Sequence, residues 1–344
     1  ARIKGGDLPA LILLQHTDVV PATKEYWDTD PFIAEIKDGY LYGRGVIDMK
    51  GAGISQLVSF IRLHRSGLSL NRDVVFVATA DEEAGGMFGA GWLIDNHPEI
   101  FEGAGFVINE GGSGQIIDGE KVFAIEITQK VPVWLRFTAV DTPGHGSSPR
   151  TTSSVYRIVH ALNLVRENPF EPRIIPSVDT YFKSLSLTMA GKEAEAFANM
   201  KNFIGSKKYQ AELQESSPSY HALTRDTCSL TMLEGSQKIN VVPPVAAAEI
   251  DCRMLPDRTA EEFIQDIKTL VEPAGVTVDV ILAFSPAVSS IDSEFFKHIA
   301  KVTQKIHPGS RIVPAVSTGF TDSHFTRDLG IDSYGFNPVL FDAG

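Results

Sequence analysis

The sequence has little of several features that define particular protein classes. Its 344 residues include only two cysteines, Cys228 and Cys252. Two cysteines are too few for a disulfide framework or for the usual four-ligand cysteine site of zinc or an iron–sulfur cluster. We therefore expect both to be buried thiols on strands. No apolar run approaches the ~18 residues needed to cross a bilayer, and no signal-peptide core is present.

Positive charge is also scarce. The chain has 31 Lys and Arg against 43 Asp and Glu, a formal net charge of −12. Such a balance argues against nucleic acid or an anionic membrane as a partner and favours a small or peptidic ligand. We predict a cytoplasmic protein, with a secreted or periplasmic form as the alternative, because the chain starts without Met and more chain is expected before Ala1 and after Gly344.

Composition excludes fibrous and disordered chains. Hydrophobic residues make up 43% of the sequence and charged residues 22%, with 29 Gly and 19 Pro but no biased tract. At roughly 150 residues per domain, the length predicts about two domains.

The first 115 or so residues alternate apolar runs with amphipathic stretches, a pattern typical of a mostly parallel sheet. We predict strands at 11–14, 74–78 and 105–108, with a helix at 50–66 between the first two. Polar residues directly follow each strand. In open α/β sheets, ligands bind outside the carboxyl ends of the strands, so a site is expected there.

The pattern changes after about residue 122. A strand, a helix, a mostly helical insertion, two strands, a helix and a strand follow, which predicts a ferredoxin-like unit interrupted by the insertion. The expected ranges are 133–140, 153–166, 167–225, 227–233, 246–254, 260–271 and 276–284. We expect a discontinuous first domain, 1–121 and 287–344, with a second domain, 122–286, inserted into it.

Nucleotide-binding glycine motifs, the G-x-S-x-G nucleophile elbow and H-E-x-x-H are all absent. Acids and histidines stand at the predicted strand ends instead. His16 and Asp18 lie on one side of an extended segment, where a carboxylate can orient a metal-bound imidazole.

Three further acids, near other predicted strand ends and turns, are also candidate site residues. Asp48 comes after a Gly-Arg-Gly turn, where it is either a helix N-cap or a bridge between two metals. Glu82 and Glu83 are neighbours and point different ways, so one could bind metal while the other acts as a base. A solvated pair is the alternative.

Three segments, 14–21 (LQHTDVVP), 42–51 (YGRGVIDMKG) and 80–86 (ADEEAGG), occur in an order that resembles the M20 family of co-catalytic dizinc hydrolases. That family includes glutamate carboxypeptidases, aminoacylases and carboxypeptidase S-like enzymes. The resemblance implies a zinc-exopeptidase-like mixed α/β sheet flanked by helices, with an inserted ferredoxin-like α+β lid and dimerisation domain.

The resemblance also implies roles for individual residues. His16 and Glu110 would bind one zinc ion, Glu83 and His324 a second, and Asp48 would bridge the two. Asp18 would support His16, and Glu82 would be the general base. A surface position before Gly111 is the alternative for Glu110.

Two segments of the inserted unit resemble the lid of that family. Residues 143–149 contain His145, which would donate to the developing oxyanion, often from the partner subunit. Asn240 and Arg253 would bind a substrate carboxylate, for which the planar fork of Arg is suited. Structural roles in the lid strands are the alternative for Asn240 and Arg253.

The predicted function is zinc-dependent hydrolysis of an amide bond in a peptide or N-acyl amino acid bearing a free carboxylate. Two Zn²⁺ per subunit are implied, with Co²⁺ or Mn²⁺ as substitutes, in a homodimer formed through the lid. The alternatives are an aminopeptidase or dipeptidase on the same scaffold and a non-catalytic dimerising family member.

Overall fold

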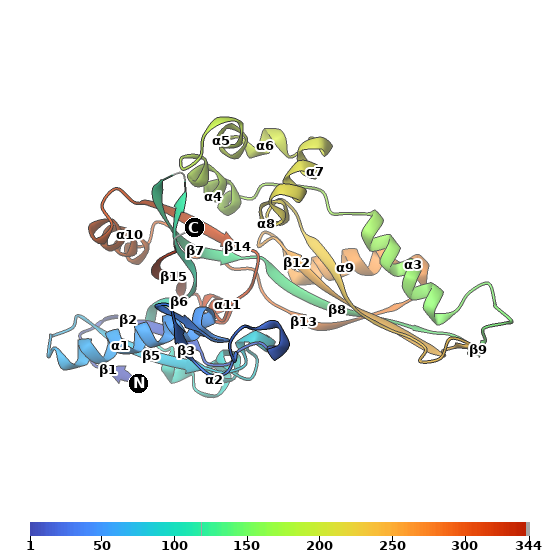
Figure 1. Cartoon of the computed structure of the whole chain (residues 1–344), viewed down its shortest axis with the longest axis horizontal. Coiled ribbons are helices and arrows are strands. Elements are labelled where there is room, and N and C mark those ends of the chain that lie inside the picture. Colours follow the sequence, from blue (N-terminus) through green and yellow to red (C-terminus); the bar gives the residue numbers. More distant parts are fainter. Residues whose placement is uncertain (118, 342–344) are drawn as a thin grey trace.

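A seven-stranded mixed sheet forms one end of the molecule (Figure 1). The structure is a computed structural model that describes residues 1–117 and 119–341; residues 118 and 342–344, which the sequence assigned to the first domain, lie outside the described residues. In sheet order the strands are β1 (Arg2–Ile3), β5 (Arg72–Thr79), β2 (Leu8–His16), β6 (Ala104–Ile117), β15 (Asp332–Phe341), β7 (Glu120–Gln129) and β14 (Arg311–Ser317).

The three strands predicted near the N-terminus lie side by side in this sheet and are parallel. β2 pairs in parallel with β5 on one side and with β6 on the other. Ile12, Leu14 and Val107 are fully buried there, which explains why these strands read as continuous apolar runs. The helix α1 (Gly51–Arg65) confirms the helix expected between the first two strands, and a second helix, α2 (Ala90–Asn96), follows β5.

A four-stranded antiparallel sheet extends from this part of the molecule. Its strand order, β10-β12-β8-β13, with two helices packed on it, is the ferredoxin-like arrangement that the sequence predicts. The elements are β8 (Val131–Val140), α3 (Ser154–Glu167), β10 (Thr227–Glu234), β12 (Val245–Met254), α9 (Ala260–Val271) and β13 (Thr277–Ala283).

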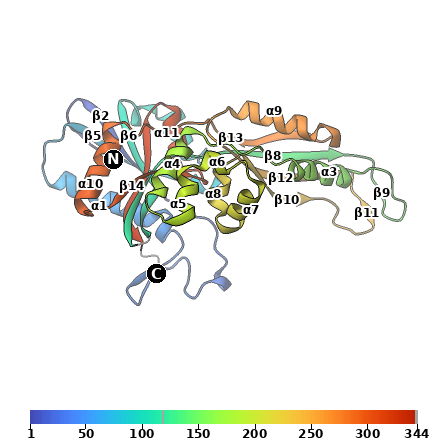
Figure 2. The same cartoon turned by 90° about the horizontal axis from the view of Figure 1, so that it is seen from above.

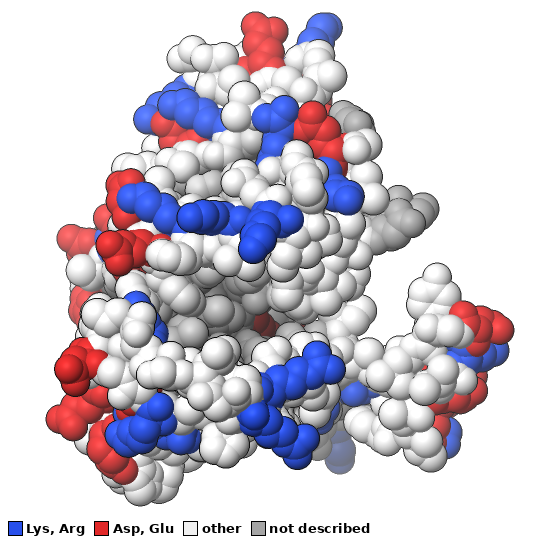
Figure 3. Space-filling model, turned by 90° about the vertical axis from the view of Figure 1, so that its left-hand side faces the viewer, with Lys and Arg blue, Asp and Glu red and all other residues white. Residues whose placement is uncertain are grey.

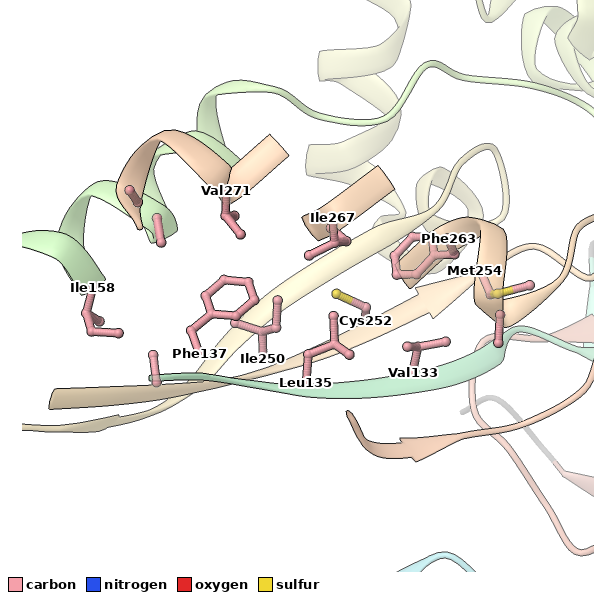
Figure 4. Packing of buried hydrophobic residues seen from close by; sticks show 14 of the residues in the cluster. Val133, Leu135, Phe137, Ile158, Ile250, Cys252, Met254, Phe263, Ile267 and Val271 are labelled. Atoms are coloured by element: carbon pink, nitrogen blue, oxygen red, sulfur yellow. The ribbon is translucent and has the colours of Figure 1, made fainter. Parts of the chain in front are cut away.

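The core of this second unit lies between the sheet and its helices. Leu135, Phe137 and Ile250 point from the strands toward Phe263 and Ile267 of α9 (Figure 4). The apolar positions of α9 recur at helical spacing, so a single face of this helix is buried.

Cys228 and Cys252 form a disulfide bond between β10 and β12. The prediction of buried free thiols is therefore wrong, although Cys252 is buried as expected. The two residues are 24 positions apart in sequence but lie directly opposite each other in the antiparallel ladder. Strand register, which composition does not reveal, brings them together.

The helices of the insertion lie beside the seven-stranded sheet, with α4 against β14 (Figure 2). Val178 and Phe182 of α4 are buried together with Val122 of β7 and Val313 of β14. β7 also belongs to the seven-stranded sheet, whereas the sequence placed residues from 122 onward in the inserted unit. An amphipathic helix does not specify which sheet covers it. The helices are α4 (Pro176–Ser186), α5 (Gly191–Ala198), α6 (Met200–Phe203), α7 (Lys207–Ser216) and α8 (Pro218–Ala222).

Shorter elements complete the described chain. Among the described residues, none of the helices combines the length and the apolar character that a bilayer span needs. The remaining elements are the strands β3 (Glu35–Lys37), β4 (Tyr40–Tyr42), β9 (Gly144–His145) and β11 (Val241–Val242), the helices α10 (Glu294–Ile306) and α11 (Ser323–Asp328), and short turns of 3₁₀ or π type at 24–26, 46–50, 82–84, 98–100 and 272–274.

Lys130 connects the two sheets. It lies between β7 and β8, is fully buried, and its Nζ donates to the carbonyl oxygens of Ala222 and Arg225 and to Thr227 Oγ1, each at 2.8 Å. One side chain thereby ties the strand that crosses between the sheets to the end of the helical insertion.

Replacing Lys130 tests this connection. Lys130→Met keeps the length of the side chain but leaves buried carbonyl groups without a donor, so we expect the free energy of unfolding to fall by about 2–4 kcal/mol. Lys183→Met, at a solvated lysine paired with Asp179, should change it by less than about 0.5 kcal/mol. Urea denaturation followed by circular dichroism measures both, and equal small effects would contradict the assignment.

Candidate metal centre

The carboxyl ends of β2 and β5, and the part of β6 just beyond its pairing with β2, place the candidate residues at one edge of the sheet. His16 ends β2 and pairs with Thr79 at the end of β5, while Glu110 lies in β6. Glu82 and Glu83 follow β5 after a turn in which Asp81 adopts a φ of +69°. Parallel neighbours end at the same edge, so side chains far apart in sequence meet there.

His16 is the centre of the cluster. Its imidazole is buried, and its Nε2 lies 3.1 Å from Asp48 Oδ1 and 3.5 Å from Glu110 Oε2. Its Nδ1 faces Asp18, at 3.1 Å from the backbone oxygen and 3.4 Å from Oδ1. The structure therefore places Asp18 where a residue that orients the ring must lie.

Asp48 reaches the cluster from an irregular segment. Gly45 has a φ of +85° and begins the turn before α1, and a Cβ there would lie only 2.6 Å from Val19. The residue that precedes α1 is Lys50, and no side chain caps this helix. The N-cap interpretation of Asp48 is therefore wrong, and its carboxylate contacts His16 instead.

Glu82 and Glu83 point in different directions, as the sequence predicts. Each belongs to a separate group whose possible ligand atoms lie within 4.8 Å of one another: Glu82 with His16 and Glu110, and Glu83 with His16 and Asp48. Glu82 is buried, whereas Glu83 is half-buried and accepts a hydrogen bond from the backbone N–H of Val20 at 3.2 Å. Asp18 Oδ2 in turn accepts from the backbone N–H of Glu83.

The electrostatics of this cluster are those of crowded carboxylates. Burial, together with the charges of Glu110 and Asp322, raises the pKa of Glu82 to about 9. Burial also raises the pKa of Glu110, while the hydrogen bond with His16 lowers the pKa of Asp48. Glu110 Oε1 and Asp18 Oδ1 are buried without a hydrogen-bond partner. Unpartnered oxygens on like charges fit a divalent cation, which would offset the repulsion.

His324 does not join this cluster. Of the described residues, those that form the two ligand groups do not include it. Its ring is buried and stacks on Phe284 with the centroids 3.5 Å apart. Burial lowers its pKa to about 3, and neither ring nitrogen has a hydrogen-bond partner. Packing against apolar rings explains why the structure does not bring His324 beside Glu83.

Asp322 is a residue that the sequence analysis missed. It is buried, its Oδ2 accepts a hydrogen bond from Thr79 Oγ1 at 2.8 Å, and its charge contributes to the raised pKa of Glu82. A signal for it exists in the sequence: Asp322 and His324 repeat, in reverse order, the spacing of His16 and Asp18. In this second pair the acid, and not the histidine, turns toward the strand ends.

The three predicted lid residues do not lie together. His145 on β9 pairs with Val241, next to Asn240, at the end of the molecule remote from β2 (Figure 1). Arg253 lies near the opposite end of β12. The eight steps from Val245 to Arg253 span roughly 26 Å in a strand. Within one chain, His145 and Asn240 are therefore remote from Arg253.

Arg253 lies at the end of the four-stranded sheet that adjoins the seven-stranded sheet, where it pairs with Pro132 at the start of β8. It donates to both carboxylate oxygens of Asp251, at 2.7 and 2.9 Å, and lies over the ring of Phe320. Its Nη1 is buried without a hydrogen-bond partner. Phe320 comes two residues before Asp322, so this guanidinium is linked to the cluster through a short stretch of chain.

Sequence comparisons place these residues in a known context. Residues 12–341 match the model of peptidase family M20/M25/M40. The chain is 31% identical over 352 residues to the N-fatty-acyl-amino acid synthase/hydrolase PM20D1 of Xenopus tropicalis, covering 98% of this chain and 67% of that protein. It is 28% identical to aminoacylase-1 of Sus scrofa, covering 96% of this chain and 72% of that enzyme.

Solved structures share the fold. The M20 family metallo-carboxypeptidase Sso-CP2 from Sulfolobus solfataricus superposes with a TM-score of 0.74 at 20% identity, covering 98% of this chain and 78% of that one. Human carnosine dipeptidase 1 gives a TM-score of 0.64 at 15% identity, covering 100% of this chain and 75% of that one.

The cluster predicts an unusual dependence of stability on pH. Because the pKa of Glu82 is about 9 in the folded chain and about 4.3 in an unfolded one, the folded state binds more protons between these values. With metal chelated, we expect the free energy of unfolding to fall as pH rises from about 5 to 9. Urea denaturation at several pH values measures the slope.

Two substitutions and the addition of zinc test whether Glu82 causes this dependence on pH. Glu82→Gln should reduce the slope because it cannot ionise, and the part that remains comes from other acids with a raised pKa, such as Glu110 and Asp322. Glu193→Gln at an exposed position should leave it unchanged. Zinc should stabilise the wild type most at high pH, because protons compete with the metal for the carboxylates. Identical slopes for the wild type and Glu82→Gln would show that ionisation of Glu82 does not cause the loss of stability.

Proposed function

The chain belongs to peptidase family M20/M25/M40, and from this membership we propose that it hydrolyses the amide bond of an N-acyl amino acid that carries a free carboxylate. Its relatives are metal-dependent hydrolases, among them an N-fatty-acyl-amino acid synthase/hydrolase and an aminoacylase. The observation that carries the proposal is the buried His16 with three carboxylates in ligand reach and Glu82 beside them.

The proposed ligands are His16, Asp48, Glu83 and Glu110. Oxygen and imidazole donors suit zinc, with cobalt or manganese as substitutes. A divalent cation bound there would polarise the amide carbonyl and lower the pKa of a bound water toward 7. His324 is left out of this proposal because its ring faces Phe284.

Glu82 is the proposed general base. Burial and the neighbouring acids raise the pKa of its carboxyl, and a divalent cation held beside it would lower that pKa again and leave a carboxylate at neutral pH. Such a group can take the proton of the attacking water and return it to the departing amine. Glu83, held by the N–H of Val20, is less free to move and is better placed as a ligand.

Arg253 is the proposed anchor for the substrate carboxylate. Asp251 fixes the plane of its guanidinium through two hydrogen bonds, and Trp134 Nε1 donates to the same Asp251 at 3.0 Å. The unpartnered Nη1 leaves donor capacity for an anionic ligand. For this reason we propose a substrate with a free carboxylate, which this guanidinium would bind.

His145 and Asn240 are proposed to act from a second copy of the chain. Both lie at the far tip of the four-stranded sheet, so neither is placed to serve the cluster of its own chain. In a symmetric dimer formed through this sheet, each tip could close over the site of the other copy. His145 would then donate to the oxyanion, and the four-stranded unit would act as a lid.

The base assignment is tested by Glu82→Gln. We expect kcat on N-acyl amino acids to fall by about 10²–10⁴-fold, because the amide cannot accept a proton. Glu102→Gln, at an exposed position, should retain full activity. Metal content measured by plasma mass spectrometry must match the wild type. Activity near that of the wild type with full metal would contradict the role of Glu82.

The role of His145 is tested by mixing two inactive variants. His145→Ala and Glu82→Gln each impair every site, but a mixed dimer contains one site with both residues intact. Random exchange of subunits should therefore restore up to about a quarter of wild-type activity. No recovery together with a monomer in light scattering would refute a site completed by the partner copy.

A further inference from the structure

An open groove leads away from the candidate metal centre along the loop that follows β5. Its volume is about 520 Å³, and Asp18 and Glu83 of the centre form part of its wall. The rest of the wall is mainly apolar and includes Val20, Pro21 and Phe88. A ligand bound at the centre would therefore enter this groove if it extended on that side.

Phe88 is the most unusual residue of this groove. Its side chain is 83% exposed, although a phenyl ring gains free energy from burial. The loop that carries it is fixed: Asp81 Oδ2 accepts a hydrogen bond from the backbone N–H of Phe88 at 2.8 Å. The backbone oxygen of Asp81 accepts from the N–H of Gly86 at 2.6 Å.

A glycine keeps this loop in shape. Gly86 has a φ of +71°, and a Cβ there would lie 2.5 Å from Asp322 Oδ1. The loop therefore passes close to a buried acid of the cluster while its tip, Met87 and Phe88, is directed to solvent. A rigid loop that presents an apolar ring loses little conformational entropy when a ligand covers it.

The charge of the groove determines which end of a substrate it accepts. All the charged residues in its wall, Asp18, Asp81 and Glu83, are acids. Carboxylates repel the carboxylate of an amino acid, so that end of the substrate is disfavoured here. The guanidinium of Arg253 lies instead on the four-stranded sheet, beside Phe320. Asp18 and Glu83 belong to the metal centre, where a bound cation would offset their charge, and apart from Asp81 the rest of the wall is apolar. The groove therefore suits an uncharged apolar group.

We propose that this groove binds the acyl chain of the substrate, and that Phe88 and Val20 make the enzyme prefer long apolar acyl groups. The inference rests on the proposed function, because it needs an N-acyl amino acid held at the metal centre. Beyond that function, the inference states where the acyl chain lies relative to the metal centre and which residues select its length.

The test is a series of substrates with one amino acid and acyl groups of increasing length: acetyl, hexanoyl, decanoyl and palmitoyl. In the wild type, kcat/KM should rise with chain length. Phe88→Ser should lower kcat/KM for the palmitoyl substrate about 10–50-fold through loss of apolar contact. It should change the value for the acetyl substrate less than twofold, because the shorter chain does not reach the ring. Phe88→Leu should keep most of the preference.

A matched control and two distinct failures complete the design. Tyr26→Ser removes an aromatic ring that is 88% exposed and outside the wall of the groove, and should leave all substrates unaffected. Equal loss on acetyl and palmitoyl substrates, or no loss at all, overturns the acyl groove while hydrolysis itself stands. A wild type that is loaded with zinc and hydrolyses none of the series overturns the proposed function, and the groove assignment falls with it.

Discussion

Repulsion among buried carboxylates is the constraint on which the candidate site depends. Glu82 and Glu110 are held beside one imidazole, His16, with Asp48 and Glu83 within reach of the same ring. Left to itself, such a cluster retains protons, which is why burial and neighbouring charge raise the pKa of Glu82 to about 9. A divalent cation removes the need for those protons. Binding of a divalent cation at the proposed site would therefore release protons, and the crowding that raises the pKa of Glu82 would favour that cation.

The fold confines these mutually repelling carboxylates to one edge of the seven-stranded sheet. Three parallel strands supply apolar residues that are buried in the sheet, and the acids and the histidine of the cluster lie at the end of β2, in the turn after β5 and in the middle of β6. Gly45 and Gly86 allow the two turns to approach the cluster closely, where a Cβ would collide with Val19 or Asp322. Elsewhere the charges are dispersed: one face of the molecule shows Lys and Arg interspersed with Asp and Glu (Figure 3). The acids proposed to take part in the chemistry are therefore gathered in one cluster at the sheet edge, and the net negative charge of the chain does not reveal them.

Local patterns predicted much of this arrangement, whereas long-range register did not follow from them. Apolar runs predicted β2, β5 and β6. Strand alternation predicted different directions for Glu82 and Glu83, which the structure reaches in another way, through a 3₁₀ turn that follows β5. His324 shows the limit: a histidine near acids in sequence packs against Phe284, while its neighbour Asp322 turns to Thr79. The disulfide depends on the alignment of β10 with β12, and the helical insertion on the sheet that its apolar faces meet. These outcomes are set by tertiary contacts that no single segment encodes.

The distribution of charge around the cluster also gives the site a direction. On one side lie acids and apolar side chains, with Phe88 held out by Asp81. Outside the wall of the groove that contains Phe88, on the four-stranded sheet, lies Arg253, whose guanidinium is fixed by Asp251 and retains an unpartnered nitrogen. An N-acyl amino acid has the same polarity, an apolar acyl group at one end and a carboxylate at the other, with the amide between them. Reversing such a substrate would bring its carboxylate against Asp18 and Glu83 and leave Arg253 without an anion. In the proposed binding mode, electrostatics would therefore favour one orientation of the substrate, with the acyl group in the groove and the carboxylate at Arg253.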